Sequence, residues 1–306
     1  MKKIFVTFGS GIYEPSVKRL VNEAKSMNIF DIVFGFNESI LGEDINSLRL
    51  FQTETRGFGY WLWKPYVVLK VLETMNENDI LLYADSGCRL NHLYRQRIIE
   101  YFNMLDQTNS TNIAFRLRYP ERNWTKKDLF DYFSVDVESL IASTGQLMAT
   151  SFLIKKTSGT IKLIKKWYET GKLLNHRYID DSPSISKNWY QFSEHRHDQS
   201  IFSILRKMNT GTIILNDEVD ECQDIFPIRA FRIKYNGYIL FGIPRKELIE
   251  HMLKVSNRLV LVTKWSDYKR TLQFVELHKL EIMYCNNIEQ TVQKLQNDGL
   301  MLLNSN

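Results

Sequence analysis

The chain has 306 residues, of which 44% are hydrophobic and 25% are charged. These values are ordinary for a globular protein, and the length suits one large α/β domain or a domain with an appendage. The 40 basic residues outnumber the 35 acidic ones only slightly. This excess is too small to argue by itself for nucleic acid as a partner, so none is expected, and it is compatible with a mild attraction to phosphates or anionic membranes.

The cysteines and the apolar segments indicate the compartment. Cys88, Cys222 and Cys285 are odd in number and far apart, which fits neither a disulfide framework nor a zinc site. We therefore expect a reducing, cytoplasmic environment, with peripheral contact at the inner face of a membrane left open. The apolar residues 4–6 are interrupted too soon for a signal peptide. No apolar run approaches the ~18 residues that span a bilayer.

The first elements have the order of an α/β protein. Residues 3–8 are predicted to form a strand, residues 13–27 a helix and residues 30–36 a second strand. This order and spacing are typical of the opening of a parallel sheet. The loop after the first strand contains Gly9, Ser10 and Gly11, which could cradle a nucleotide. Because their spacing matches neither the dinucleotide nor the P-loop signature, a plain tight turn is an equal alternative.

The stretch 56–90 combines an aromatic loop, a helix and a buried strand. After Pro65 the apolar residues recur at the spacing of one helix face, and proline suits a first helical turn. Residues 80–84 are a continuous apolar run, as expected of a strand covered on both faces. Asp85 ends this run, and ligands of open α/β sheets bind at the carboxyl ends of strands. We therefore predict that Asp85 meets a ligand, such as a divalent cation; the alternative is a turn former or helix cap.

Aromatic residues surround a basic one at the start of this stretch. Arg56 lies among glycines and aromatic residues, where it is a candidate for contact with an acidic substrate. Trp61 and Trp63 are predicted to lie on a loop. They are either a wall against which a ring stacks or packing for the start of the helix.

Farther along, the elements continue to alternate. Helices are predicted over residues 92–105 and 159–170, and strands over residues 113–117, 145–154 and 213–215. This alternation continues the α/β pattern.

Two polar segments between these elements are predicted to be irregular. Residues 120–133 concentrate charged and aromatic groups without periodicity, and loops of this kind often carry function. Residues 178–190 are rich in Asp, Ser, Pro and Asn. We predict a loop there that closes over a site.

Residues 194–200 read Glu-His-Arg-His-Asp-Gln-Ser and lead into a predicted helix over residues 201–208. The two histidines do not have the i, i+4 spacing of a zinc hydrolase. Asp198, with Gln199 beside it, is a candidate for catalysis, and Asp198 or Ser200 is equally a candidate to cap the helix. In the stretch 226–232, Arg229 and Arg232 bring positive charge either to the pocket or to the surface.

Several motifs, in order over roughly residues 1–240, resemble those of one enzyme class. They are residues 56–65 (RGFGYWLWKP), 79–87 (DILLYADSG), 121–128, Gly145-Gln146 and 195–200. Together they resemble a set of nucleotide-sugar glycosyltransferases from bacterial surface-polysaccharide clusters and large viruses. The resemblance implies a GT-A fold, which is an α/β fold with a Rossmann-like, mixed but mainly parallel central sheet flanked by helices.

The resemblance also implies an Asp-centred motif that meets a metal diphosphate. The usual GT-A motif is Asp-X-Asp, whereas Tyr83 stands two residues before Asp85. A single carboxylate can suffice when water and diphosphate oxygens supply the other ligands.

The predicted function is transfer of a sugar from a nucleotide-diphosphate sugar to a glycan, lipid-linked or other hydroxyl acceptor, in surface polysaccharide or glycoconjugate synthesis. Catalysis is predicted for Asp198, which would be the base of an inverting reaction, and for His197. Metal binding, by Mn²⁺ or Mg²⁺, is predicted for Asp85. The nucleotide sugar is predicted to bind Gly9, Arg56, Tyr60, Trp61, Lys64, Asp85, Ser86, Gly87, Gln146, Gln199 and Arg229. The acceptor is predicted to bind Glu121, Trp124, Lys126 and Asp181.

Two other functions compete with this prediction. A sugar-phosphate nucleotidyltransferase shares the sheet type, but it would need a Gly-rich, Lys-bearing phosphate loop near the N-terminus. A non-catalytic carbohydrate-binding protein is suggested by the six tryptophans.

The chain is predicted to have two parts. Residues 1–242 form the GT-A-like domain, and residues 243–306 form a small βαβα appendage that the resemblance does not cover. In the appendage, strands are predicted over residues 259–262 and 282–284, with helices around residues 268–278 and 288–297.

Overall fold

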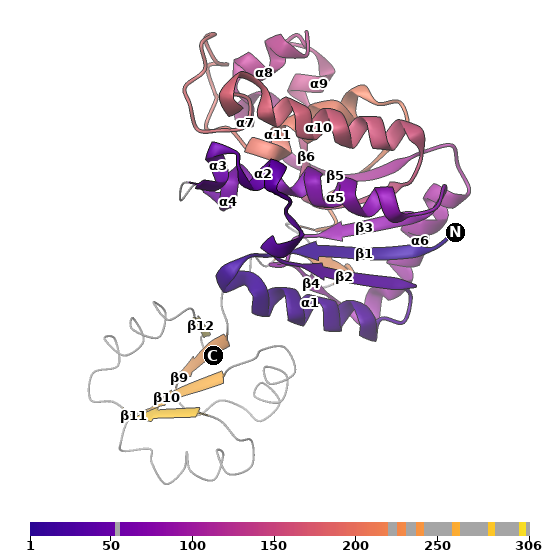
Figure 1. Cartoon of the computed structure of the whole chain (residues 1–306), viewed down its shortest axis with the longest axis vertical. Helices are drawn as coiled ribbons and strands as arrows, with labels where there is room; N and C mark the ends of the chain where they lie inside the picture. The colour runs from indigo at the N-terminus through magenta and orange to yellow at the C-terminus, as the bar shows by residue number, and fades with distance from the viewer. Residues whose placement is uncertain are drawn as a thin grey trace.

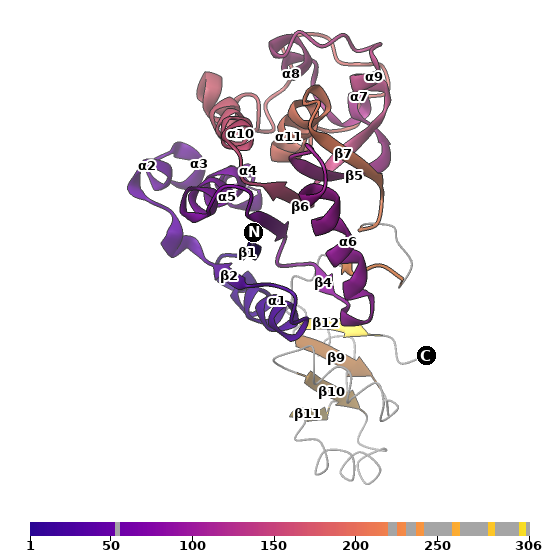
Figure 2. The same cartoon turned by 90° about the vertical axis from the view of Figure 1, so that its right-hand side faces the viewer.

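A computed structural model gives the arrangement of the chain (Figure 1). It describes residues 1–52, 56–219 and 225–230, and the backbone of four later strands at 237–241, 259–263, 281–284 and 300–303. The principal described part has three layers, with helices on both faces of a central sheet (Figure 2).

The central sheet has six strands in the order β2-β1-β3-β6-β5-β7. They are β1 (Lys3–Phe8), β2 (Ile32–Phe36), β3 (Ile80–Ala84), β5 (Asn112–Pro120), β6 (Gly145–Lys155) and β7 (Thr212–Asn216). β6 runs antiparallel to β3 and β5, and the other pairs are parallel. The predicted mixed, mainly parallel sheet is therefore confirmed. β3 lies between β1 and β6 and is buried throughout, as its continuous apolar run predicts.

Two apolar cores hold the helices on the sheet. One face carries α1 (Glu14–Ser26) and α6 (Arg95–Asp106), and the other carries α5 (Trp63–Thr74), α10 (Ser158–His176) and α11 (His197–Met208). Successive side chains of a strand point to opposite faces. In β1, Ile4 and Val6 accordingly pack with α5 and α10, whereas Phe5 packs with α1 and α6.

Short elements complete the principal part. They are η1 (Gly11–Tyr13), η2 (Glu38–Ile40), α2 (Glu43–Asn46), α3 (Arg49–Gln52), α4 (Gly57–Tyr60), β4 (Arg89–Leu90), η3 (His92–Tyr94), α7 (Glu121–Trp124), α8 (Lys127–Tyr132), α9 (Leu140–Ser143) and β8 (Ile228–Arg229). β4 and β8 pair with each other. The segment 178–190 contains no helix or strand, as predicted.

The polar segment 120–133 was predicted as an irregular connector, and this prediction is wrong. It folds as the short helices α7 and α8. Neither helix is long enough to show a helical period in the sequence. Their buried residues include Glu121 and Asp128, which a search for apolar periodicity does not recognise as inward-facing.

The C-terminal part contains a second sheet. Its strands are β9 (Gly237–Phe241), β10 (Leu259–Thr263), β11 (Glu281–Tyr284) and β12 (Leu300–Leu303), in the parallel order β11-β10-β9-β12. β10 and β11 were predicted, whereas β9 and β12 were not. β9 precedes the predicted boundary at residue 242 and pairs with β10 and β12, while the boundary itself stays a prediction. The predicted helices around residues 268–278 and 288–297 lie outside the described residues.

Candidate active site

A cleft of about 650 Å³ lies at the carboxyl ends of β1 and β3. Its walls include Gly9 and Ser10 after β1, and Asp85 to Gly87 after β3. The carboxyl edge of an open α/β sheet is where such folds bind ligands, and the volume suits a cofactor-sized molecule. Asp85 thus lies at the end of a central strand and faces a cleft, as predicted.

Most of the residues predicted for the site line this cleft, although they come from distant parts of the chain. They are Gly9, Arg56, Trp61, Lys64, Asp85, Ser86, Gly87, Trp124, Gln146, His197, Asp198 and Gln199. The structure brings these residues together, and their roles in binding or catalysis remain predictions.

The centre of the cleft is an ion cluster of Lys64, Asp85 and Asp198. The Nζ atom of Lys64, near the start of α5, lies 3.0 Å from Asp85 Oδ1 and 3.3 Å from Asp198 Oδ2. It also donates to the carbonyl oxygen of Ala149 at 3.2 Å. Tyr83 donates its hydroxyl to Asp85 Oδ1 at 2.7 Å. One ammonium group therefore joins a carboxylate at the end of β3 to a carboxylate at the start of α11.

Burial and charge act in opposite directions in this cluster. Burial by itself would lower the pKa of Lys64, but the carboxylates of Asp198 and Asp85 outweigh it and hold that pKa above its ordinary value. Burial raises the pKa of Asp198 to about 6, against the lowering effect of Lys64 and together with the charge of Asp85. Asp198 is thus mostly ionised at neutral pH and remains a usable base.

Asp198 does not act as the N-cap of α11. The helix begins at His197, earlier than the predicted start at residue 201, so the N-cap residue is Arg196, which forms no side-chain cap bond. Ser200 Oγ instead accepts from the Arg196 backbone N–H at 3.1 Å. Asp198 lies in the first turn, where the helix dipole favours a carboxylate, and its ion partner is Lys64.

Two amide side chains connect the cleft to a buried polar group. Gln199 Nε2 donates to Gln146 Oε1 at 2.6 Å, and Gln146 Nε2 donates to Glu121 Oε1 at 2.8 Å. Glu121 is completely buried, and its Oε2 lies 3.0 Å from Lys207 Nζ. The structure does not bring Glu121 to the cleft wall, where the sequence placed it for acceptor binding. Glu121 instead accepts a hydrogen bond from Gln146 on the side away from the cleft, and Gln146 in turn accepts one from Gln199.

The remaining predicted residues also lie off the cleft wall. Lys126 is buried and donates to backbone and side-chain oxygens of Asp180 and Ser182 at 3.2–3.4 Å. Asp181 and Tyr60 both approach His197. Arg229 belongs to β8, which pairs with β4. Arg232 lies outside the described residues.

The two tryptophans of the aromatic loop have different environments. Trp63 borders the cleft but is only 6% exposed and stacks on Phe8 with ring centroids 4.1 Å apart, so packing dominates there. Trp61 is only partly buried and lines the cleft.

The structure adds cleft residues that the sequence did not single out, among them Tyr119 and Arg196. Tyr119 belongs to the end of β5, beyond the predicted strand, and its ring lies 5.6 Å from that of Trp124. The Arg196 guanidinium lies 4.4 Å above the Trp124 ring and 2.9 Å from Glu194. Arg196 lies between His195 and His197, within the segment 194–200 that the sequence analysis identified as a candidate for function. This position is the sequence feature that could have predicted a place for Arg196 in the cleft.

Within the described part of the chain, no helix has the length and apolarity to cross a membrane. Over the same residues, no cluster of three or more His, Cys, Asp or Glu side chains is arranged to hold a metal ion.

The sequence matches no protein-family model and no curated protein. Similar solved structures include a glycosyltransferase involved in glycosylation of the major capsid of PBCV-1, with 12% identity, a TM-score of 0.43 and coverage of 75% of this chain and 94% of that one. Mouse xyloside xylosyltransferase 1 has 10% identity, a TM-score of 0.44 and coverage of 75% and 97%. Glycosyltransferase GlyE of Streptococcus pneumoniae has 11% identity, a TM-score of 0.41 and coverage of 99% and 86%.

Proposed function

We propose that this protein is a glycosyltransferase that moves a sugar from a nucleoside-diphosphate sugar to a hydroxyl group of a glycan or lipid-linked acceptor. The observation that carries the proposal is the cluster of Lys64, Asp85 and Asp198 at the carboxyl edge of the sheet. In this proposal Asp85, which is partly exposed at the cleft, serves the diphosphate through a bound cation. Asp198, which is buried, serves proton transfer.

Asp198 is the proposed base. In an inverting transfer the acceptor hydroxyl attacks the anomeric carbon and loses its proton, while the bond from that carbon to the diphosphate oxygen breaks. Because burial raises the pKa of Asp198 to about 6, the carboxylate is ionised at neutral pH and has a proton affinity near the working pH. Lys64, 3.3 Å from it, keeps the group charged and fixes its position.

The proposal includes Mn²⁺ or Mg²⁺ at Asp85. Asp85 is the residue that would hold such an ion, because its side chain is 29% exposed at the cleft and its oxygens are the hard ligands that these ions take. Within the ion cluster itself, the two carboxylates of Asp85 and Asp198 outweigh the single charge of Lys64. When bound, a divalent cation supplies neutralisation of the leaving group. Water and diphosphate oxygens would complete its ligands.

The aromatic residues of the cleft suit the rings of the substrates. Trp61, Tyr119 and Trp124 line its walls, and aromatic faces stack on other rings. Arg56 and Arg196 also line the cleft, and both are held by Glu194 at 3.5 and 2.9 Å. These cations are placed to attract an anionic donor.

The test is donor binding followed by turnover. Calorimetry with uridine and guanosine diphosphates should show binding, and a panel of nucleotide sugars should reveal one that is slowly hydrolysed. Proton NMR of the released sugar then reports whether configuration inverts. Binding of glycan without any nucleotide would identify a carbohydrate-binding protein. Release of pyrophosphate from a nucleoside triphosphate and a sugar phosphate would identify a nucleotidyltransferase.

The biological setting is part of the same proposal. A role in surface polysaccharide or glycoconjugate synthesis, a cytoplasmic location and contact with the inner face of a membrane are supported by the sequence motifs and the cysteine content. Cell fractionation together with the acceptor screen tests them.

A further inference from the structure

The ring of His197 has an unusual set of neighbours. Its Nδ1 atom lies 2.8 Å from the carbonyl oxygen of Ile179. A carbonyl oxygen only accepts hydrogen bonds, so Nδ1 carries a proton and the neutral ring has its lone pair on Nε2. Burial lowers the pKa of His197, although Ile179 and Asp181 act in the opposite direction. The ring is therefore neutral at neutral pH, and Nε2 is an acceptor.

No donor reaches this acceptor from the residues that the structure describes. The His197 side chain is only 3% exposed, and Nε2 makes no hydrogen bond to any described residue. The atom that it faces is Asp181 Oδ1, 3.6 Å away. Two acceptors thus face each other across a short gap. Burying an acceptor without a donor is unfavourable, and a bound donor would remove that cost.

The backbone around the ring is strained. His197 has φ +51°, and the residues whose rings contact it, Tyr60 and Trp61, have φ +50° and +62°. Their ring centroids lie 4.9 and 5.5 Å from that of His197. Positive φ is uncommon outside glycine and is concentrated at functional sites. Three such residues therefore meet at one contact.

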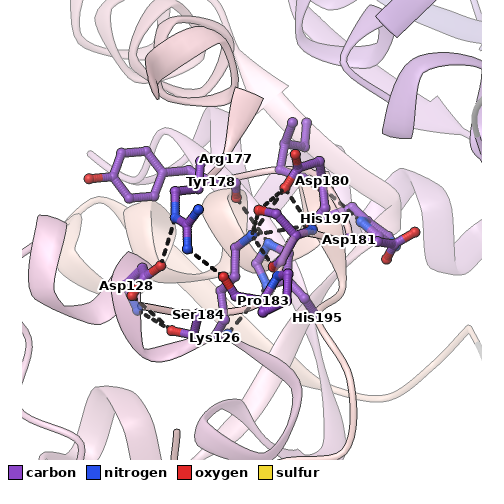
Figure 3. A network of polar contacts seen from close by, with 12 residues as sticks. Lys126, Asp128, Arg177, Tyr178, Asp180, Asp181, Pro183, Ser184, His195 and His197 are labelled. Atoms are coloured by element: carbon purple, nitrogen blue, oxygen red, sulfur yellow. Dashed lines mark hydrogen bonds and ion pairs between the residues drawn. The ribbon is translucent and has the colours of Figure 1, made fainter. Parts of the chain in front are cut away.

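Contacts made by its chain neighbours hold the segment that contains Asp181 in place (Figure 3). On one side, Lys126 Nζ donates to Asp180 and Ser182, the two chain neighbours of Asp181. Arg177 Nε donates to Asp128 at 3.2 Å, which ties down the start of the same segment. Asp181 itself is 52% exposed. Its carboxylate is therefore held near His197 while remaining accessible to a ligand.

The geometry points to a sugar-binding subsite in which two neighbouring ring hydroxyls donate to His197 Nε2 and Asp181 Oδ1, with Tyr60 and Trp61 beside them. Adjacent hydroxyls of a sugar are two donors on one rigid ring, which matches two acceptors 3.6 Å apart. His197 and Trp61 also line the cleft, so the subsite adjoins the ion cluster. This inference rests on the proposed function, and the sugar belongs either to the donor or to the acceptor.

Asp181→Ala and His197→Gln test the subsite, with the exposed Asp106→Ala as the control. Calorimetry gives the Kd of the nucleoside diphosphate and of its nucleotide sugar, and initial rates give the KM of the acceptor. If the sugar belongs to the donor, each site variant weakens nucleotide-sugar binding by roughly 10- to 100-fold and leaves the diphosphate unchanged. If it belongs to the acceptor, KM rises by the same factor and both donor affinities are unchanged.

A deoxy analogue of the responsive sugar adds a second readout. Removing the hydroxyl that donates to Asp181 should weaken binding to the wild type but produce little further loss in Asp181→Ala, because its partner is already gone. The inference is overturned when the diphosphate binds normally and neither variant changes sugar affinity or KM. Absence of any nucleotide binding by the wild type would instead refute the proposed function, and the subsite with it.

Discussion

Replacing the buried carboxylate of the ion cluster should change how the stability of the protein depends on pH. Asp198 has a side chain that is only 6% exposed, and burial raises its pKa from 3.8 to about 6. A carboxyl group that binds its proton more tightly in the folded state contributes stability below the unfolded pKa and loses that contribution as pH rises through the folded pKa. The ionised group therefore destabilises the fold at neutral pH, and Asp198→Asn removes this effect.

The magnitude follows from the two pKa values. Their difference corresponds to about 3 kcal/mol over the whole titration. Only part of this change in unfolding free energy falls within the pH range in which melts are easily measured. The linkage relation gives a change of about 1.4 kcal/mol between pH 5 and pH 8. For a domain of this size the wild type should thus lose about 3–6 °C in Tm relative to Asp198→Asn over that interval.

Thermal melts of the wild type and Asp198→Asn at both pH values provide the assay, with the exposed Asp106→Asn as the matched control. The gap in Tm between Asp198→Asn and the wild type should widen in favour of the variant at the higher pH, and the control should show no such trend. A gap that does not depend on pH would refute the buried, ionised carboxylate. The same variant should lose transfer by roughly 10²–10⁴-fold while binding nucleotide normally.

Three further outcomes are expected. Lys64→Met removes the ammonium group that lowers the pKa of Asp198. The pKa of the base should therefore rise, and the pH–rate profile of transfer should move to higher pH. The control Lys70→Met, at an exposed position of the same helix, should leave the profile unchanged. Glu121→Gln breaks a buried ion pair and should destabilise the fold by roughly 3 kcal/mol in urea denaturation, whereas an unchanged stability with a raised acceptor KM would restore its predicted role in acceptor binding. Asp85→Asn should abolish the gain in nucleoside-diphosphate affinity that Mn²⁺ gives the wild type, measured by calorimetry with and without chelator, and an equal affinity in all four conditions would make Asp85 structural.

The sequence predicted the sheet well because its signals are local. β1 and β3 have the predicted bounds, since each is an apolar run that ends at glycine or at a polar turn. The end of β3 in turn placed Asp85 at the edge of the sheet. The apolar residues that form β3 and the site residue Asp85 are neighbours in the sequence, so one local pattern predicts the position of both.

The fate of polar residues depends on partners that the sequence does not reveal. Glu121 and Lys126 were both predicted to bind the acceptor because they are charged residues in a segment without periodicity. Glu121 is neutralised by Lys207, and Lys126 is surrounded by oxygens from Asp180 and Ser182. Each partner is more than fifty residues away. A charge with a buried partner and a charge in a cleft look alike until the chain is folded.

β6, which lies beside the two carboxylates of the cleft, contains an irregularity. Its pairing with β5 shifts register between Ala114 and Arg116 of β5, whose partners are Phe152 and Leu147. This shift releases peptide groups of β6 from the ladder, including those of Ala149. Bulges of this kind occur beside active sites, and buried peptide groups need other partners.

Side chains of α5 and α11 supply those partners. Lys64 Nζ donates to the Ala149 carbonyl, and the Ala149 N–H donates to Gln199 Oε1 at 3.0 Å. Farther along α11, Ser203 Oγ accepts from the Leu147 N–H, and Arg206 donates to the carbonyls of Leu147 and Met148. One residue of the bulge thus anchors both the lysine of the ion cluster and the residue next to Asp198. The antiparallel strand β6 thus holds both Lys64, which contacts Asp85, and Gln199, which is the neighbour of the proposed base Asp198. The bulge makes this possible because it leaves the peptide groups of Ala149 free to bind these side chains.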